Sequence, residues 1–196
     1  MSFTRIKLCL TIAMSLFLIV SIYSRCYAQS EEANYKKEFS ILSGWMDGNL
    51  RSQNDYEMVP LYLQFGFDIT PSFYSKRLSG SLKFIVEPFF NTVISPDKNV
   101  EIGNDFILRY SYPVVEKFHV YIEGGAGAMY TSQHTAEQGT QFNFTEQVGC
   151  GVYYFFSKNK AINLGYRYRH FSNCDIKSPN KGVDMDGFLA GISILY

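Results

Sequence analysis

The sequence predicts an all-β fold, an eight-stranded antiparallel transmembrane β-barrel, and three observations lead to it. Apolar and polar residues alternate with a period of two through most of residues 38–196, which is the spacing of strands whose two faces meet different surroundings. The apolar face is large and aromatic, whereas the opposite face is polar and rich in glycine. Beyond Tyr23 the chain has no apolar run long enough for a helical span.

The N-terminal segment has the pattern of a cleavable secretory signal. Arg5 and Lys7 precede an almost wholly apolar stretch, and Cys26-Tyr27-Ala28 then offers small residues two positions apart. We therefore expect a signal peptide over 1–28 and one domain, the barrel, over 29–196. A single transmembrane helix is the alternative, which the short run and the cleavage pattern disfavour.

The charge of the mature chain argues against nucleic-acid binding, and the spacing of its two cysteines argues against a disulfide. Of the 18 basic residues three lie in the signal, against none of the 18 acidic ones, so the mature net charge is about −3 and gives no electrostatic reason to bind nucleic acid. Cys150 and Cys174 remain, but folding the expected hairpin about Lys158 separates them by about 20 Å along the strands. A disulfide needs Cα atoms within about 7 Å, so we expect none.

Eight strands fit the alternation. Aromatic and β-branched residues fill them, and polar, glycine or proline clusters separate them. The 17 Phe and 15 Tyr suit the aromatic girdles of transmembrane barrels. The expected strands are 38–47, 58–69, 80–91, 100–111, 117–131, 140–156, 161–173 and 184–196.

The chemistry of the two faces distinguishes a membrane barrel from a water-soluble fold. In the second expected strand, Leu61 and Phe65 share the apolar face, while Gln64 and Gly66 lie on the other. Small polar residues suit the cramped interior of a small barrel, and the aromatic face suits lipid. A soluble β-sandwich is the alternative, in which the apolar face would be the buried one.

Two sets of links alternate along the chain, and one set is on average longer and more polar than the other. Bacterial outer-membrane barrels have short periplasmic turns and longer outer loops, so we expect a bacterial outer-membrane protein with the longer links outside. The longer set is 48–57, 92–99, 132–139 and 174–183, and the shorter set is 70–79, 112–116 and 157–160.

Reactive side chains gather on the last two expected strands. The apolar row of the seventh continues at its outer end into His170 and Ser172, and the row of the eighth extends backwards to Asp186 and Asp184. A hairpin brings these side chains to one outer surface. A hydroxyl, an imidazole and a carboxylate make the nucleophile, base and orienting acid of acyl transfer. A polar rim without a catalytic role is the alternative, because His-x-Ser is a short pattern.

The segment that follows resembles a family signature. It reads His170-Phe171-Ser172-Asn173, a short loop, Pro179-Asn180, one residue, Gly182, one residue and Asp184. This pattern resembles the C-terminal signature of the lipid A 3-O-deacylase (PagL) family, also called acyloxyacyl-hydrolase-like proteins. Weaker likeness lies at 87–88, 129–131 and 144–149.

The resemblance implies an eight-stranded outer-membrane barrel that removes the ester-linked acyl chain at position 3 of lipid A, the membrane anchor of lipopolysaccharide. Its partners are then lipid A as substrate and the lipid of the outer membrane. The match makes Ser172 the nucleophile, His170 the base and Asp184 the acid, acting toward the outer leaflet. It associates Asn173 and Asn180 with oxyanion stabilisation, although Asn180 fits equally well as a turn residue after a proline.

The sequence leaves some points open. The best-known members of the family have Glu at the acid position, and the shorter Asp184 must approach His170 more closely. Asp186 shares the row of Asp184, so both aspartates are candidates for the acid. Glu146 falls on the lipid-facing row beside His170. It fits a second acid, a substrate contact or, as we favour, an inward residue displaced by a bulge. The acyl-chain preference and the oligomeric state, a homodimer included, also stay open.

The predicted function is a serine esterase acting on lipid A. We expect no cofactor and no metal, because His119 and His134 lack a second ligand at useful spacing. The alternatives are a non-catalytic barrel, either a scaffold or a small pore, and an esterase for other membrane lipids. Eight strands leave room only for side chains, which disfavours the pore.

We predict that tags inserted in 132–139 or 174–183 are reachable from outside intact cells and that tags in 157–160 are not, because the longer links are expected outside. Antibody labelling of intact and permeabilised cells measures this. The opposite labelling would overturn the orientation.

Overall fold

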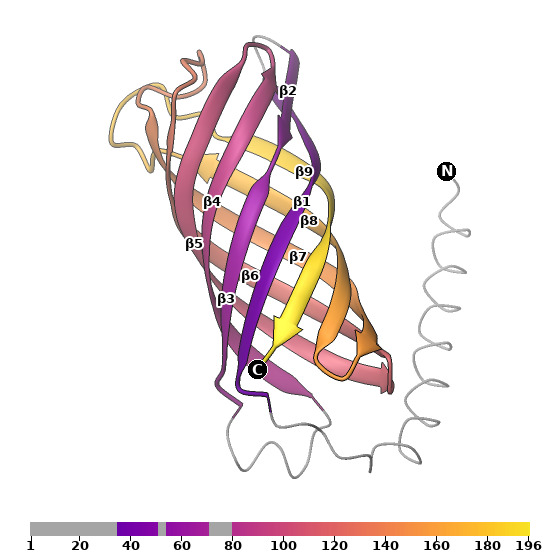
Figure 1. Ribbon diagram of the computed structural model, residues 1–196. Coiled ribbons are helices and arrows are strands. Elements are labelled where there is room, and N and C mark those ends of the chain that lie inside the picture. The colour runs from indigo at the N-terminus through magenta and orange to yellow at the C-terminus, as the bar shows by residue number, and fades with distance from the viewer. Residues whose placement is uncertain (1–34, 51–53, 71–79) are drawn as a thin grey trace, which may run out of the picture.

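The computed structural model describes residues 35–50, 54–70 and 80–196. The expected signal peptide, 1–28, lies outside the described residues. Within them, nine strands close into one ring (Figure 1). None of the described residues forms a helix long and apolar enough to cross a membrane. The strands are β1 (Lys37–Leu50), β2 (Asn54–Val59), β3 (Leu61–Asp68), β4 (Ser81–Ser95), β5 (Asn99–Val115), β6 (Phe118–Thr131), β7 (Phe142–Ser157), β8 (Lys160–Ser172) and β9 (Val183–Leu195).

Antiparallel pairing runs around the whole ring. From β3 to β9 each strand pairs with the next along the chain. β1 closes the ring against β9, from Glu38 opposite Leu195 to Gly48 opposite Met185. Because the described strands form a closed ring, none of them has an unpaired edge, which is the condition for a sheet to lie in lipid.

The second strand position differs from the prediction. The single strand expected over 58–69 is two strands, β2 and β3, separated at Pro60. Proline has no backbone N–H to donate to the ladder, so the pairing stops there and then resumes. The register with β1 is kept, since Met58 lies opposite Met46 and Leu61 lies opposite Ser43. The ring therefore has the eight strand positions predicted, one of them interrupted.

Large apolar side chains cover the outside of the ring. Phe106, Ile122 and Phe188 are 51%, 64% and 73% exposed. Leu61 also points outward, while the inward Gln64 is buried, as the alternation predicts. Such an apolar outer face on a closed sheet is the surface that lipid covers. The fold is therefore a transmembrane β-barrel.

Buried ion pairs fill much of the interior. The guanidinium of Arg167 lies between two acids, 2.7 Å from Glu87 and 2.9 Å from Glu123. Arg169 lies 2.7 Å from Glu101, and both side chains are fully buried. A charge removed from water needs an opposite charge and hydrogen bonds beside it. These pairs meet that need and hold the inward side chains of β8 in place.

The two ends of the barrel differ. The end that we call the turn end has the short links 116–117 and 158–159, and the chain ends there at Tyr196 (Figure 1). The opposite end, the loop end, has the links 96–98, 132–141 and 173–182. The links expected at 48–57 and 92–99 are shorter than predicted, because the strands beside them run further.

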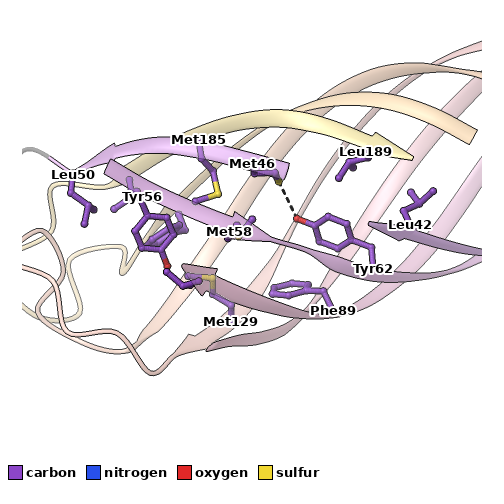
Figure 2. Close-up of a cluster of buried hydrophobic side chains, with 13 residues drawn as sticks. Leu42, Met46, Leu50, Tyr56, Met58, Tyr62, Phe89, Met129, Met185 and Leu189 are labelled. Atoms are coloured by element: carbon purple, nitrogen blue, oxygen red, sulfur yellow. Dashed lines mark hydrogen bonds between the residues drawn. The ribbon is translucent and has the colours of Figure 1, made fainter. Parts of the chain in front are cut away.

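An apolar cluster fills the interior toward the loop end (Figure 2). From the sequence we expect a polar, glycine-rich interior, and this cluster corrects that expectation. Methionine side chains take up its irregular spaces, and the Tyr62 hydroxyl contacts Met46 Sδ at 3.4 Å. The members are Leu42, Met46, Leu50, Tyr56, Met58, Tyr62, Phe89, Val93, Met129, Phe171, Val183, Met185 and Leu189.

The two cysteines of the described residues are separate. Cys150 lies on β7 and Cys174 in the 173–182 link, and both are free and exposed. The prediction that they form no disulfide is confirmed.

We expect Arg169→Ala to lower the free energy of unfolding by about 3–5 kcal/mol, because Glu101 would stay buried without its counter-charge. Urea unfolding of protein refolded in detergent measures the change. Lys117→Ala removes an exposed turn cation and serves as the control, with an expected change within about 0.5 kcal/mol. Equal losses in the two variants would contradict the account of the interior.

Candidate functional site

The pleat of β8 sets the direction of the predicted site residues. Arg167, Arg169 and Phe171 point into the barrel and are at most 1% exposed. His170 and Ser172 alternate with them, so they lie on the outer surface near the loop end. The structure therefore puts both residues on the lipid-facing side, as predicted.

His170 forms a close pair with Asp184. The two residues lie directly opposite each other on β8 and β9, and His170 Nδ1 is 2.7 Å from Asp184 Oδ1. An ionised carboxylate only accepts hydrogen bonds, so Nδ1 donates and Nε2 of a neutral ring keeps its lone pair. In this tautomer a histidine can take a proton from a hydroxyl group.

Asp186 has a different partner. It lies opposite Tyr168, and its Oδ2 accepts a hydrogen bond of 2.7 Å from the Tyr166 hydroxyl. Of the two candidates for the acid, Asp184 is thus the one that contacts His170.

Ser172 is the last residue of β8 and is half-buried, opposite Phe144 of β7. Two positions along a strand span about 6.6 Å, and the two side chains share a face. Within the described part of the chain, no hydrogen bond joins Ser172 to His170. The structure thus provides a histidine–aspartate pair and a neighbouring serine, one contact short of a complete triad.

Glu146 flanks His170 on the other side. It pairs with His170 across β7 and β8 and is exposed on the outer surface. The only register shift between these strands lies far away, between Phe155 and Ser157. The interpretation that we favoured, an inward residue displaced by a bulge, is therefore wrong. A second acid and a substrate contact are the interpretations that fit its position.

The two asparagines hold the link 173–182 in shape. Asn173 is buried, its backbone N–H donates to Asn180 Oδ1 at 2.9 Å, and its Nδ2 donates to the carbonyls of Lys177 and Pro179 at 2.8 and 3.1 Å. Asn180 Nδ2 donates to Asp175 Oδ1 at 3.1 Å. In this arrangement both amide hydrogens of Asn173 are committed to the loop.

The link 132–141 braces this loop. The N–H of Gly139 donates to the Pro179 carbonyl at 2.6 Å, and the N–H of Lys181 donates to the Glu137 carbonyl at 2.9 Å. Two long links thus support each other beside the end of β8, which fixes the backbone that follows Ser172.

Two further contacts were not anticipated from the sequence. Gly182 has φ +67°, and a Cβ atom there would lie 2.4 Å from His170 Cε1, so only glycine lets the imidazole occupy its place. The Tyr168 hydroxyl donates to Asp184 Oδ1 at 2.6 Å. The sequence feature that could have indicated this contact is the position of Tyr168 on the same outward row as His170.

The fold and these side chains define a class: a transmembrane β-barrel whose outer face carries a histidine–aspartate pair and a neighbouring serine. The family comparison is more specific. Residues 23–193 match the family model of the Lipid A 3-O-deacylase (PagL), and the chain belongs to this family.

One curated relative is the lipid A deacylase PagL of Bordetella bronchiseptica, 40% identical over 68 residues. That match covers 33% of this chain and 36% of the relative, so it spans about a third of the relative's length.

Two solved structures share the fold. The crystal structure of the outer membrane enzyme PagL has a TM-score of 0.61 and 19% identity, and it covers 79% of this chain and 97% of its own. Neisserial surface protein A has a TM-score of 0.61 and 13% identity, covering 82% of this chain and 97% of its own. The likeness is equal for an enzyme and for a protein named only for its location, so the fold does not decide the activity.

We predict that Gly182→Ala displaces the His170 ring from Asp184, because the added methyl group meets the imidazole and the backbone is in the left-handed region. The ¹⁵N spectrum of the histidine ring in detergent micelles reports whether Nδ1 still donates to a carboxylate. Asp184→Asn gives the reference spectrum for the lost contact. A Gly182→Ala spectrum identical to wild type would disprove the packing role.

Proposed function

We propose that this protein is an outer-membrane serine esterase that hydrolyses the ester-linked acyl chain at position 3 of lipid A. The observation that carries the proposal is the 2.7 Å contact between His170 and Asp184 on the lipid-facing side, with Ser172 two positions along the same strand. Membership of the lipid A 3-O-deacylase family supplies the substrate and the bond that is cleaved.

In the first half of the reaction Ser172 becomes acylated. Its Oγ attacks the carbonyl carbon of the ester while its proton passes to Nε2 of His170. The tetrahedral intermediate then breaks the bond to the sugar oxygen, which takes the proton from His170 and leaves as a free 3-hydroxyl group. The acyl chain stays on Ser172.

In the second half, water releases the acyl chain. His170 takes a proton from water, the hydroxide adds to the acyl carbon, and Ser172 Oγ leaves and regains its proton from His170. Asp184 stabilises the imidazolium in both halves and keeps Nε2 turned to the reaction. Ester and water supply all the atoms, so the reaction balances without a cofactor.

The negative oxygen of each tetrahedral intermediate needs hydrogen-bond donors, which typically contribute about 3–4 kcal/mol. We assign this oxygen to the region of Asn173 and Asn180. Asn173 acts there through the shape of the loop, because its side chain donates to Lys177 and Pro179. Asn180 has a second amide hydrogen besides the one donated to Asp175, which makes it the side-chain donor of choice.

The position of the site suits a lipid substrate. The side chains of His170 and Asp184 lie on the outer face of the barrel wall and are accessible from the side. We propose that the loop end lies at the outer leaflet, where lipid A is anchored. An ester near the acyl chains then reaches Ser172 without leaving the membrane. The filled interior, with Arg167 between its two acids, disfavours a pore.

We predict that Ser172→Ala and His170→Ala each lower the rate of 3-acyl release by several orders of magnitude, and that the double variant loses little more. The reason is that a nucleophile and its base act as one unit. Mass analysis of lipid A incubated with refolded protein measures the loss, and heat-modifiable gel mobility checks that each variant folds.

Two outcomes separate the parts of this proposal. Near wild-type deacylation by folded Ser172→Ala would rule out the serine mechanism. If the wild-type protein leaves lipid A unchanged but cleaves esters in phospholipid micelles, the proposed serine mechanism stands and the assignment of lipid A as substrate is wrong.

A further inference from the structure

Tyr168 contacts the proposed acid. Its hydroxyl lies 2.6 Å from Asp184 Oδ1, the same oxygen that lies 2.7 Å from His170 Nδ1. One oxygen of Asp184 therefore accepts hydrogen bonds from two donors, the ring of His170 and the hydroxyl of Tyr168. In the proposed reaction Tyr168 forms and breaks no bond to the substrate. We propose that Tyr168 is a positioning residue that holds Asp184 against His170. This inference rests on the proposed function.

Asp184 needs such support because its side chain is 64% exposed. An exposed ion pair contributes little by itself, since water and other rotamers compete with the paired geometry. A tyrosine hydroxyl on a stiff ring, anchored on the neighbouring strand, gives the carboxylate a second fixed point. The carboxylate then stays in place when His170 becomes charged during the reaction, when its orientation matters most.

The contact is a diagonal one. Tyr168 lies opposite Asp186, and it reaches two positions along β9 to Asp184, a distance that aromatic side chains can span. Tyr166 makes the same diagonal contact to Asp186, at 2.7 Å. Two chemically equal tyrosine–aspartate pairs therefore stand side by side on the barrel wall, and only one of them includes the partner of His170.

This repetition supplies a matched control. Tyr168→Phe and Tyr166→Phe each remove one hydroxyl group from the same strand face and leave the ring. We expect Tyr168→Phe to lower kcat for 3-acyl release roughly tenfold, the loss typical of one hydrogen bond to a charged group. The apparent KM for lipid A in mixed micelles stays unchanged, because Tyr168 does not touch the ester. Tyr166→Phe stays near wild type.

A double-mutant cycle tests whether Tyr168 acts through Asp184. In the Asp184→Asn background, Tyr168→Phe should cause no further loss of kcat, because the carboxylate that it positions is gone. An equal tenfold loss in both backgrounds, or equal losses in Tyr168→Phe and Tyr166→Phe, would overturn the proposal. Heat-modifiable mobility confirms folding of each variant.

The ¹⁵N resonances of the His170 ring give a readout independent of activity. Tyr168→Phe should weaken the Nδ1 contact to Asp184, and Tyr166→Phe should not. If wild-type protein releases no acyl chain from lipid A, the proposed function fails, and this spectrum alone decides the role of Tyr168. An unchanged Nδ1 signal in Tyr168→Phe would then refute it.

Discussion

The pairing of Arg167 and Arg169 with carboxylates inside the barrel is the constraint on which the site depends. A closed ring of eight strand positions leaves only enough interior space for side chains, and a guanidinium there needs its acid. Arg167 has Glu87 and Glu123, and Arg169 has Glu101. A shift of β8 by one residue would expose both arginines to lipid and turn His170 inward. The interior pairs thereby fix His170 and Ser172 on the membrane side.

The same interior gives the outward residues a rigid base. Phe171 lies between His170 and Ser172 and packs in the apolar cluster, and Val183 and Met185 do so on either side of Asp184. The side chains of the proposed site therefore alternate with anchored ones on two paired strands. Sites built on such elements keep their geometry better than sites on loops. The loop after Ser172 is in turn closed by hydrogen bonds of its own.

Period-two alternation was sufficient to predict the strands, their inner and outer faces and the hairpin that places His170 near Asp184. What it could not predict depends on partners distant in sequence or on rotamers. Alternation put Glu146 on the outer row, but only the register of β7 with β8 excludes the bulge that would have turned it inward. The diagonal bond from Tyr168 to Asp184 and the commitment of the Asn173 amide are choices of side-chain conformation, which spacing alone does not contain.

Covalent labelling can show whether the lipid-facing row of β8 carries an activated serine. Folded protein is incubated with a long-chain p-nitrophenyl phosphonate, which reacts with activated serine hydroxyls, and the adduct is located by peptide mass spectrometry. We expect one adduct, on Ser172, that is lost in His170→Ala because the base is missing. An adduct on a different residue, or none from protein that does release acyl chains, would contradict this expectation.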